Sequence, residues 1–343
     1  MRVLHVTDCM TSGTGEAILD IAGKVSKAEH FLLYDYRKDA PPPIYSNLDR
    51  NFADSVLWKS GLVSRYAHLI RTIKKLNPDY VYLHSTYAGV YGRLVPLKVK
   101  ILYSAHGFAF QKNDFSNFQK RLSLLAERCL SIRRQTYVAL WPLEFLQAQS
   151  MLYYQNIEFM SLRIIQNLKA SQFLDNQSKV GKKNFAIVGR ITPSKDPLFA
   201  IEVAHRIRSL DSEINIHWIG EYGDQISNSA LDMQDSGIII EPWLEKELLL
   251  EYLKSFQAVL ITSSWEAGPL VLFESLTKGV PIIARKIPAV EILGIQSFDS
   301  ADDFALEVVK VSNSRVYRKA LFETQFKTIC RVLSSLPEVN PFK

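Results

Sequence analysis

The sequence predicts an α/β protein made of two doubly wound domains. Short apolar runs alternate with helical segments along the whole chain, which is the pattern of parallel strands joined by helices. The length of 343 residues suits about two domains of ordinary size. With 47% hydrophobic and 22% charged residues, the chain has the composition of a globular protein with a large core.

The first domain is expected over residues 1–168. Its strands and helices are read from apolar runs that switch between the two-residue and the 3.6-residue period. The expected strands cover residues 2–7, 31–36, 80–84, 101–104 and 136–139, and the expected helices cover residues 16–26, 62–76 and 115–134.

A polar, lysine-rich linker at residues 169–183 leads to a second domain over residues 184–322. Its expected strands are 185–188, 214–219, 238–240, 258–262 and 281–284, and its expected helices are 197–210, 245–255, 269–278 and 302–311. An amphipathic helix follows at 314–336, and residues 323–343 are expected to pack back on the first domain. Ligands of parallel sheets bind beyond the C-terminal ends of the strands, so functional residues are expected there.

The composition and the N-terminal sequence indicate the cellular compartment of the protein. No apolar run is long enough to predict a transmembrane helix, and the N-terminus enters a strand without the basic start of a signal peptide. Cys9, Cys129 and Cys330 are far apart and odd in number, so they predict neither a disulfide framework nor a metal site. We therefore expect a cytoplasmic protein with reduced cysteines.

Positive charge is concentrated in the first half. Residues 1–170 carry 22 Lys and Arg against 13 Asp and Glu, whereas the remainder carries 19 against 22. This asymmetry favours an anionic partner such as nucleic acid or an anionic membrane, with a solvated surface as the alternative. No nucleic-acid-binding module is recognisable, so no nucleic-acid partner is expected.

The stretch SSWEAGPLVLFESLTKGVPIIA is the most informative part of the chain. Glu266 and Glu274 lie on either side of an Ala-Gly-Pro turn, and Glu274 sits in an apolar run where it needs a partner. Pro269 reads as the first residue of a helix, which leaves the amides of Leu270 and Val271 free to hold an anion. The stretch therefore predicts a helix N-terminus that faces a phosphate.

The loop GRITPSKDP follows another expected strand. Arg190 and Lys195 supply two cations, and Gly189 allows the backbone to approach a ligand closely. The planar guanidinium of Arg190 and the ammonium of Lys195 together could bind a diphosphate. The alternative is that they are ordinary surface cations.

Two further strand ends carry candidate binding residues. Gly220 ends the strand in WIGEYGD, and residues 221–224 are expected to form a turn. Trp243 and Leu244 follow the strand in IIIEPWLEKEL, where an aromatic side chain can hold a nucleobase. Core packing of Trp243 is the alternative.

The first half offers weaker signals. Gly13 and Gly15 open a helix after the first strand, but the pattern is not that of a dinucleotide site, and a simple strand-to-helix turn is the alternative. His106 follows the strand 101–104 and is expected to face a hydroxyl or phosphate rather than the core. His84 also ends a strand, either in the same pocket or in a structural role.

Together these motifs resemble those of the retaining glycosyltransferases of family 4, the group 1 type, in its bacterial surface-polysaccharide members. GRITPSKDP is similar to the family's G-R-x-x-x-x-K-G/D segment, WEAGPLVLFE to its E-G-x-P-x-x-x-x-E signature, and WIGEYGD to its glycine turn. YLHSTYAGVYGRL, AHGFAF and IIQN match more loosely. The resemblance implies the GT-B fold, in which two Rossmann-like domains flank an interdomain cleft.

The resemblance also implies the reaction. A hexose or N-acetylhexosamine would pass from a nucleotide-diphosphate sugar, with UDP the expected nucleotide, to a glycan or polyprenyl-linked acceptor, with retention and without a metal or other cofactor. Arg190 and Lys195 would hold the diphosphate, and Glu274 the ribose. The implied donor-binding residues are Gly13, Gly15, Gly189, Arg190, Lys195, Gly220, Trp243, Leu244, Gly268, Pro269, Leu270, Val271 and Glu274, and the implied catalytic residues are His106 and Glu266.

A lipid-linked acceptor would explain the basic first half through contact with an anionic membrane at its inner face. The candidate amphipathic surface comprises Arg121, Arg128, Arg133 and Arg134 with Leu122, Leu124, Leu125 and Leu130. An ordinary core-facing helix is the alternative. For the whole chain, the alternatives are a non-catalytic GT-B partner subunit of another transferase, or a nucleotide-sugar epimerase on the same scaffold.

Overall fold

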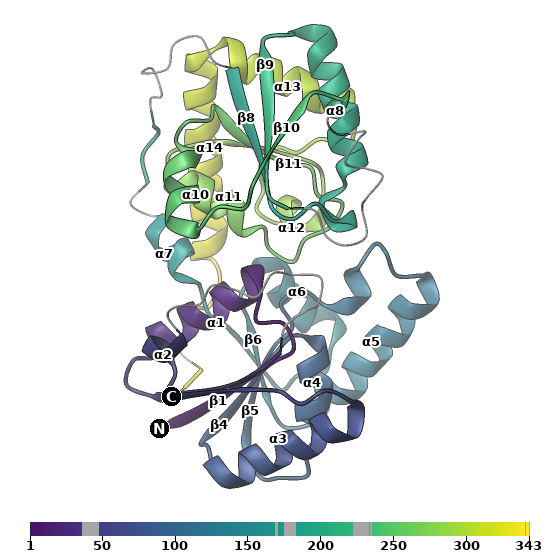
Figure 1. Ribbon diagram of the computed structural model, residues 1–343, viewed down its shortest axis with the longest axis vertical. Coiled ribbons are helices and arrows are strands. Elements are labelled where there is room, and N and C mark those ends of the chain that lie inside the picture. The colour runs from purple at the N-terminus through teal and green to yellow at the C-terminus, as the bar shows by residue number, and fades with distance from the viewer. Residues whose placement is uncertain are drawn as a thin grey trace. The chain divides into compact units, whose positions relative to one another are not determined.

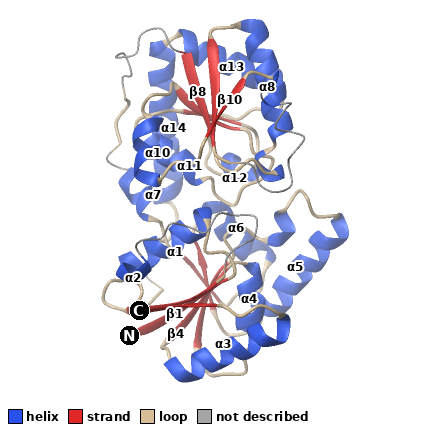
Figure 2. Ribbon diagram, viewed as in Figure 1, coloured by secondary structure: helices blue, strands red, loops and turns tan. Residues whose placement is uncertain are grey.

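The computed structural model describes residues 1–35, 48–168, 171–174, 183–221, 233, 235–339 and 341–342. The chain forms two compact units, which Figures 1 and 2 show as separate α/β bodies. Unit 1 comprises residues 1–163 and 337–343, and unit 2 comprises residues 164–336. Most of the expected linker 169–183 and residues 222–224 of the expected turn lie outside the described residues.

Unit 1 contains a seven-stranded parallel sheet in the order β3-β2-β1-β4-β5-β6-β7. Its strands are β1 Arg2–Thr7, β2 Glu29–Tyr34, β3 Asp54–Leu57, β4 Tyr80–His84, β5 Lys100–Ser104, β6 Thr136–Ala139 and β7 Asn156–Phe159. Its helices are α1 Ser12–Lys24, α2 Leu48–Asn51, α3 Leu62–Leu76, α4 Thr86–Arg93, α5 Asn117–Ser131 and α6 Pro142–Met151.

The sequence reading missed β3 and β7 because both are short edge strands that are not buried along their length. It missed α4 because two glycines weaken the helical pattern. Both glycines have a packing reason: a Cβ at Gly92 would lie 2.2 Å from a methyl group of Leu83, and one at Gly89 would lie 2.5 Å from the ring of Tyr103. α4 therefore packs unusually close to β4 and β5.

The C-terminal segment 337–343 is part of unit 1. Glu338 forms a parallel bridge with Phe159, next to the end of β7. The ring of Phe342 is 8% exposed and lies 5.7 Å from that of Tyr80, edge to face. The chain thus returns to the unit in which it began.

Unit 2 contains a five-stranded parallel sheet in the order β10-β9-β8-β11-β12. Its strands are β8 Lys183–Val188, β9 Ile214–Ile219, β10 Ile238–Glu241, β11 Ala258–Ile261 and β12 Ile282–Ala284. The helices are α7 Arg163–Leu168, which begins at the unit boundary, α8 Pro197–Leu210, α10 Lys246–Leu253, α11 Leu270–Thr277, α12 Pro288–Glu291, α13 Ala301–Asn313 and α14 Arg315–Ser334.

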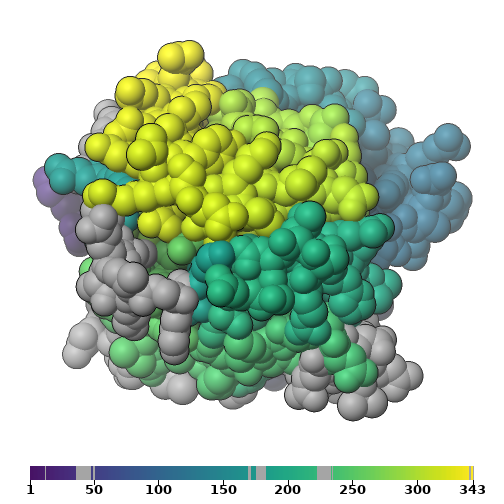
Figure 3. Space-filling view, turned by 90° about the horizontal axis from the view of Figure 1, so that it is seen from above, coloured from purple at the N-terminus to yellow at the C-terminus, as the bar shows by residue number. Residues whose placement is uncertain are grey.

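Helices cover both faces of the unit 2 sheet. α8 and α13 pack together on one face over a core that includes Phe199, Trp218 and Phe304, while α10 and α11 lie on the other (Figure 2). Figure 3 shows α13 and α14 side by side on the surface of this unit, in yellow-green and yellow.

Each sheet has a point where the strand order reverses. In unit 1 it lies between β1 and β4, and in unit 2 between β8 and β11. Loops leave the sheet in opposite directions at such a point and open a crevice beyond the carboxyl ends of the strands, where ligands of this fold class bind. The two reversal points therefore locate the candidate site residues.

Candidate functional site

The loops after β8 and β11 meet at the reversal point of unit 2. Lys195 Nζ lies 2.6 Å from Glu266 Oε1, and Ser263 Oγ donates to the same oxygen at 2.9 Å. The side chains of Lys195 and Glu266 are each 19% exposed. Two residues that the sequence reading assigned to the donor therefore form one partly buried ion pair.

Main-chain contacts hold these two loops together. The amide of Ser264 donates to the carbonyl of Ser194 at 2.9 Å, and the hydroxyl of Thr262 donates to the carbonyl of Lys195 at 2.9 Å. Arg285, at the end of β12, donates to the carboxylate of Asp196 at 2.5 Å. The position of the Lys195 ammonium is thus set by neighbouring strands as well as by its own loop.

Gly189 and Gly220 make this arrangement sterically feasible. Both adopt positive φ, +129° and +155°. A Cβ at Gly220 would lie 2.2 Å from the carbonyl oxygen of Gly189, and a Cβ at Gly189 would lie 2.8 Å from Lys195 Cε. Trp218 Nε1 donates to the same Gly189 carbonyl at 2.8 Å. The half-buried Arg190 follows directly after this fixed point.

The apolar stretch after Glu266 forms α11. Pro269 is the N-cap of this helix rather than its first residue, since its ψ of 98° is extended and the helix begins at Leu270. Gly268 and the amides of Leu270 and Val271 lie at this N-terminus, where main-chain N–H groups lack acceptors within the helix.

Glu274 is 7% exposed on α11, and its Oε1 lies 3.6 Å from Lys246 Nζ. The sequence predicted that this carboxylate has a polar partner, but it did not identify Lys246. Lys246 is the first residue of α10, directly after the loop that carries Trp243 and Leu244. Trp243 is 44% exposed, so the alternative of core packing is wrong, and Leu244 is half-buried in the same loop.

The unit 1 residues lie at the reversal point of their own sheet or next to it. Gly13 and Gly15 occupy the first turn of α1, after β1. Asp8, at the end of β1, accepts a hydrogen bond from the hydroxyl of Ser85, at the end of β4. Ser85 has a φ of +83° and caps α4.

His106 follows β5 in a left-handed conformation, with a φ of +52°. Its Nε2 lies 3.0 Å from Nδ1 of His84, so the fully buried His84 supports His106 rather than lining a pocket. Burial lowers the pKa of His106 to about 4. The imidazole is therefore neutral at pH 7 and acts through hydrogen bonds.

Glu144 holds the backbone beside His106. Its fully buried carboxylate accepts from the amide of Gly107 at 2.6 Å and from that of Leu140 at 3.3 Å. Burial raises the pKa of Glu144 to about 7, although the hydrogen bonds from these amides oppose the shift. The sequence reading missed Glu144; its only signal was a carboxylate in the first turn of the proline-led helix α6.

α5 presents an apolar stripe to solvent. Phe118, Leu122, Leu125 and Ile132 are 75%, 55%, 57% and 64% exposed, and their spacing of three to seven residues places them along one side of the helix and its end. Leu124 and Leu130 are only half-buried neighbours of this stripe.

The four arginines named for this surface divide into two groups. Arg121 and Arg134 are exposed. Arg128 Nε donates to the carbonyl of Met151 at 3.0 Å, and Arg133 donates to the carbonyl of Arg93, the last residue of α4, and to that of Leu97 at 3.3 Å. Two of the four cations therefore hold main chain in place.

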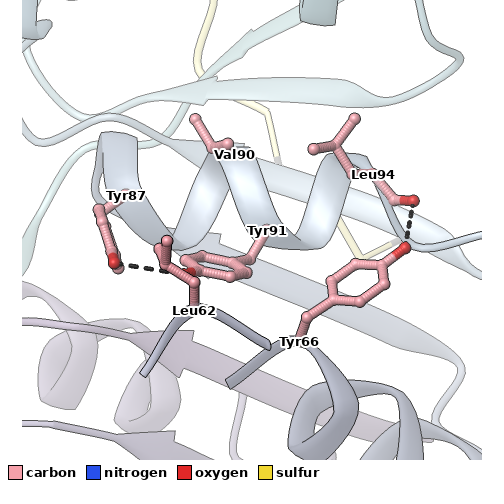
Figure 4. Close-up of a pocket in the computed structure, with 6 residues that line it drawn as sticks. All are labelled: Leu62, Tyr66, Tyr87, Val90, Tyr91 and Leu94. Atoms are coloured by element: carbon pink, nitrogen blue, oxygen red, sulfur yellow. Dashed lines mark hydrogen bonds between the residues drawn. The ribbon is translucent and has the colours of Figure 1, made fainter. Parts of the chain in front are cut away.

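A groove between α3 and α4 is a separate feature of unit 1 (Figure 4). It has a volume of about 550 Å³, and its lining is apolar or aromatic: Leu62, Tyr66, Tyr87, Val90, Tyr91 and Leu94. Hydrogen bonds from Tyr66 to the Leu94 carbonyl at 2.8 Å and between Tyr87 and Tyr91 at 3.3 Å fix its walls. None of the residues predicted for the site lines this groove.

The described residues lack two features that would suggest other functions. No group of three or more His, Cys, Asp and Glu side chains there is placed to hold a metal ion. Within the same residues, no helix combines the length and the apolar composition that a membrane span requires.

Comparison with known proteins gave similarities to glycosyltransferases. Residues 169–293 match the model of the family described as glycosyl transferases group 1. An uncharacterized 41.2 kDa protein in the cps region of Klebsiella pneumoniae is 23% identical, covering 98% of this chain and 95% of that protein. The UDP-Gal:alpha-D-GlcNAc-diphosphoundecaprenol alpha-1,3-galactosyltransferase of Escherichia coli is 26% identical, covering 72% and 70%.

The solved structure of Anabaena Alr3699/HepE in complex with UDP and glucose is similar in fold. Its TM-score is 0.70 at 14% identity, and the likeness covers 98% of this chain and 100% of that one. The prediction of two Rossmann-like domains of the GT-B type is confirmed.

Proposed function

We propose that this chain transfers a hexose or N-acetylhexosamine from a UDP-sugar to a glycan or polyprenyl-linked acceptor, because residues 169–293 match the model of the group 1 glycosyl transferases. The named activity of the Escherichia coli relative, which combines a UDP-sugar with a lipid diphosphate, supports both substrates. The cps-region relative supports a role in surface polysaccharide assembly.

The Lys195–Glu266 pair at the reversal point of unit 2 carries this proposal. The Lys195 ammonium is anchored above Gly189, and Arg190 follows that glycine. In the proposed complex the donor diphosphate binds the ammonium of Lys195, which is a point charge, and the planar guanidinium of Arg190. Glu266 holds the ammonium in place and lies next to the transferred sugar.

Unit 2 also offers groups for the rest of the nucleotide. Glu274 accepts hydrogen bonds from the ribose hydroxyls, and Lys246 balances its charge. Trp243 and Leu244, in the loop before Lys246, hold the base. Gly268 and Pro269 leave room at the start of α11, where the amides of Leu270 and Val271 face phosphate or sugar oxygens.

Fixed charges supply the catalytic effect in this proposal. As the bond from the anomeric carbon to the diphosphate breaks, Arg190, Lys195 and the α11 N-terminus stabilise the leaving group without a metal ion. The acceptor hydroxyl attacks on the face from which the diphosphate leaves, so the product retains configuration. His106 binds a hydroxyl of the sugar, and its neutral state follows from its lowered pKa.

We also propose that α5 makes peripheral contact with an anionic membrane at its cytoplasmic face. The exposed stripe of Phe118, Leu122, Leu125 and Ile132 provides apolar area, and Arg121 lies beside it on the same helix. These two features support contact with the interface of an anionic bilayer. A polyprenyl-linked acceptor is reached from the same surface.

A donor screen tests the function. Thermal stabilisation by UDP, but not by GDP or ADP, and release of UDP from a UDP-sugar in the presence of a polyprenyl-linked acceptor are the expected results. A protein that no nucleotide stabilises would favour a non-catalytic partner subunit, and sugar interconversion without an acceptor would favour an epimerase.

Glu274→Ala tests the ribose assignment. We expect the variant to bind UDP about tenfold more weakly than the wild type, because it lacks charge-assisted hydrogen bonds to the ribose. It should bind 2′,3′-dideoxy-UDP as well as the wild type does. Equal weakening for both nucleotides would contradict the assignment.

A further inference from the structure

Four histidines form a hydrogen-bonded row across the unit 1 sheet. His30 lies on β2, His5 on β1, His84 at the end of β4 and His106 after β5, and these four strands are consecutive neighbours in the sheet. The ring nitrogens of adjacent members lie 2.9 Å, 3.0 Å and 3.0 Å apart. His5 and His84 are fully buried, and His30 is 4% exposed.

The first bond of the row fixes its direction. His30 Nε2 lies 3.0 Å from the carbonyl oxygen of Val25, which can only accept, so this nitrogen carries a proton. A neutral His30 then has a bare Nδ1, which accepts from Nε2 of His5 at 2.9 Å. The proton on His5 is thereby placed on Nε2.

The same logic passes along the rest of the row. His5 Nδ1 accepts from His84 Nε2, and His84 Nδ1 accepts from His106 Nε2. The row requires its members to be neutral, and burial lowers the pKa of each of the four below the ordinary value. One tautomer, with the proton on Nε2, is therefore imposed on all four rings.

We propose that His30, His5 and His84 are positioning residues that lock His106 in the Nε2–H tautomer, so that its Nδ1 offers a lone pair to a sugar hydroxyl of the substrate. This inference rests on the proposed function for the identity of the hydroxyl. Of the two ligands expected for His106, a hydroxyl and a phosphate, the inference selects the hydroxyl. A bare Nδ1 accepts a hydrogen bond from a hydroxyl but repels a phosphate oxygen.

The backbone around His106 fits this role. Gly107, the next residue, donates its amide hydrogen to Glu144 at 2.6 Å, and His84 holds the ring of His106 through its Nε2. His106 itself is half-buried, unlike His5 and His84. The row thus connects the main-chain carbonyl of Val25 to the ring of His106, the member that is least buried as a whole residue.

Histidine ¹⁵N NMR of the full chain tests the lock directly, because protonated and bare ring nitrogens resonate far apart. The expected spectrum at pH 7.5 shows Nε2 protonated and Nδ1 bare in all four members, each assigned by a single substitution. A proton on Nδ1 of His106 would overturn the proposal.

Two substitutions of His30 separate a lock from a packing role. His30→Asn keeps an acceptor in the place of Nδ1, so His106 should retain its single tautomer. His30→Leu removes that acceptor, and His106 should become a mixture of tautomers. The control His68→Asn changes a histidine of the same unit that lies outside the row. Unchanged His106 signals in His30→Leu would contradict the lock.

The hydroxyl role has its own readout. Addition of UDP-galactose should shift the bare Nδ1 resonance of His106, and His30→Leu should lower kcat/KM about tenfold, the effect of roughly one hydrogen bond, with His30→Asn near wild type. Binding of UDP-galactose with an unmoved Nδ1 resonance would overturn this role. If no UDP-sugar binds, the proposed function and the hydroxyl role fall together, while the tautomers still decide the lock.

Discussion

The two units share one architecture but keep their polar chemistry in different places. Unit 1 buries it within the sheet and under its helices, as the histidine row and the Arg93–Glu127 pair show. Unit 2 places its central ion pair, Lys195–Glu266, in loops beyond the strand ends, each side chain 19% exposed. The difference supports the proposal that the unit 2 pair binds a charged ligand, whereas the groups of unit 1 are held by buried partners.

Mild acid should produce the largest difference in stability between the two units. His5, His84 and His106 have pKa values below the ordinary 6.5 because they are buried, so the unfolded chain takes up protons that folded unit 1 refuses. Their contribution to stability is present above pH 6.5 and is lost as pH falls toward 4, by up to about 1.4 kcal/mol per pH unit for each histidine.

Glu144 acts in the opposite direction. Its pKa of about 7 lies above the ordinary 4.5, so its contribution is present at low pH and is lost as pH rises through 7. Burial also raises the pKa of Glu158, but it lowers the pKa values of His30 and His68 as well, so the imidazoles outnumber the carboxyls and unit 1 should unfold in acid before unit 2. Amide NMR peaks followed separately for each unit between pH 7 and 4 will show the order, and loss of unit 2 first would contradict it.

Removal of one charge from the buried pair should have the next largest effect. Both terminal nitrogens of Arg93 donate hydrogen bonds to the carboxylate of Glu127, at 2.8 Å and 3.1 Å. The hydroxyls of Tyr103 and Tyr154 donate to the same carboxylate. Glu127→Ala leaves a buried guanidinium without its counter-ion, so the free energy of unfolding of unit 1 should fall by about 3–5 kcal/mol.

The matched control lies on the surface of unit 2. Arg206 pairs with Asp302 at 3.0 Å, with side chains 52% and 68% exposed. Arg206→Ala should cost no more than about 1 kcal/mol, because water screens such a pair. Urea unfolding of both variants measures the difference, and similar losses would show that burial of the pair has no special weight.

A smaller effect is expected at the membrane surface. Leu122→Ser removes one side chain of the α5 stripe and should weaken partition into phosphatidylglycerol vesicles about tenfold, since burying a leucine contributes about 1.5 kcal/mol or more. Leu198→Ser is the control, because Leu198 on α8 is 67% exposed and has no part in the stripe. Equal partition of both variants, measured by vesicle sedimentation, would reject α5 as the contact.

How much the sequence predicts also differs between the units. The unit 2 site lies in two contiguous segments, around Lys195 and from Glu266 to Glu274, so local spacing was enough to find it. The strand 214–219 and the helix 197–210 were predicted to the residue, because their apolar periods are regular.

The chemistry of unit 1 could not be read in the same way. Its four histidines are spread from position 5 to position 106, and only the strand order β2-β1-β4-β5 brings them into a row. The sequence suggested only that His84 and His106 could share a pocket, and the helix that carries Glu144 was not predicted. Lys246 was overlooked for the same reason, since its contact with Glu274 depends on how α10 packs against α11.

We propose above all that the Lys195 loop of unit 2 binds the diphosphate of a UDP-sugar. Calorimetric titration of wild type and Lys195→Ala with UDP and with uridine tests it, with Lys254→Ala, from the exposed pair with Glu251, as control. We expect only Lys195→Ala to raise the Kd for UDP, by about 10- to 100-fold, and to leave the Kd for uridine unchanged. An unchanged Kd for UDP in Lys195→Ala, or equal weakening for UDP and uridine, would contradict it.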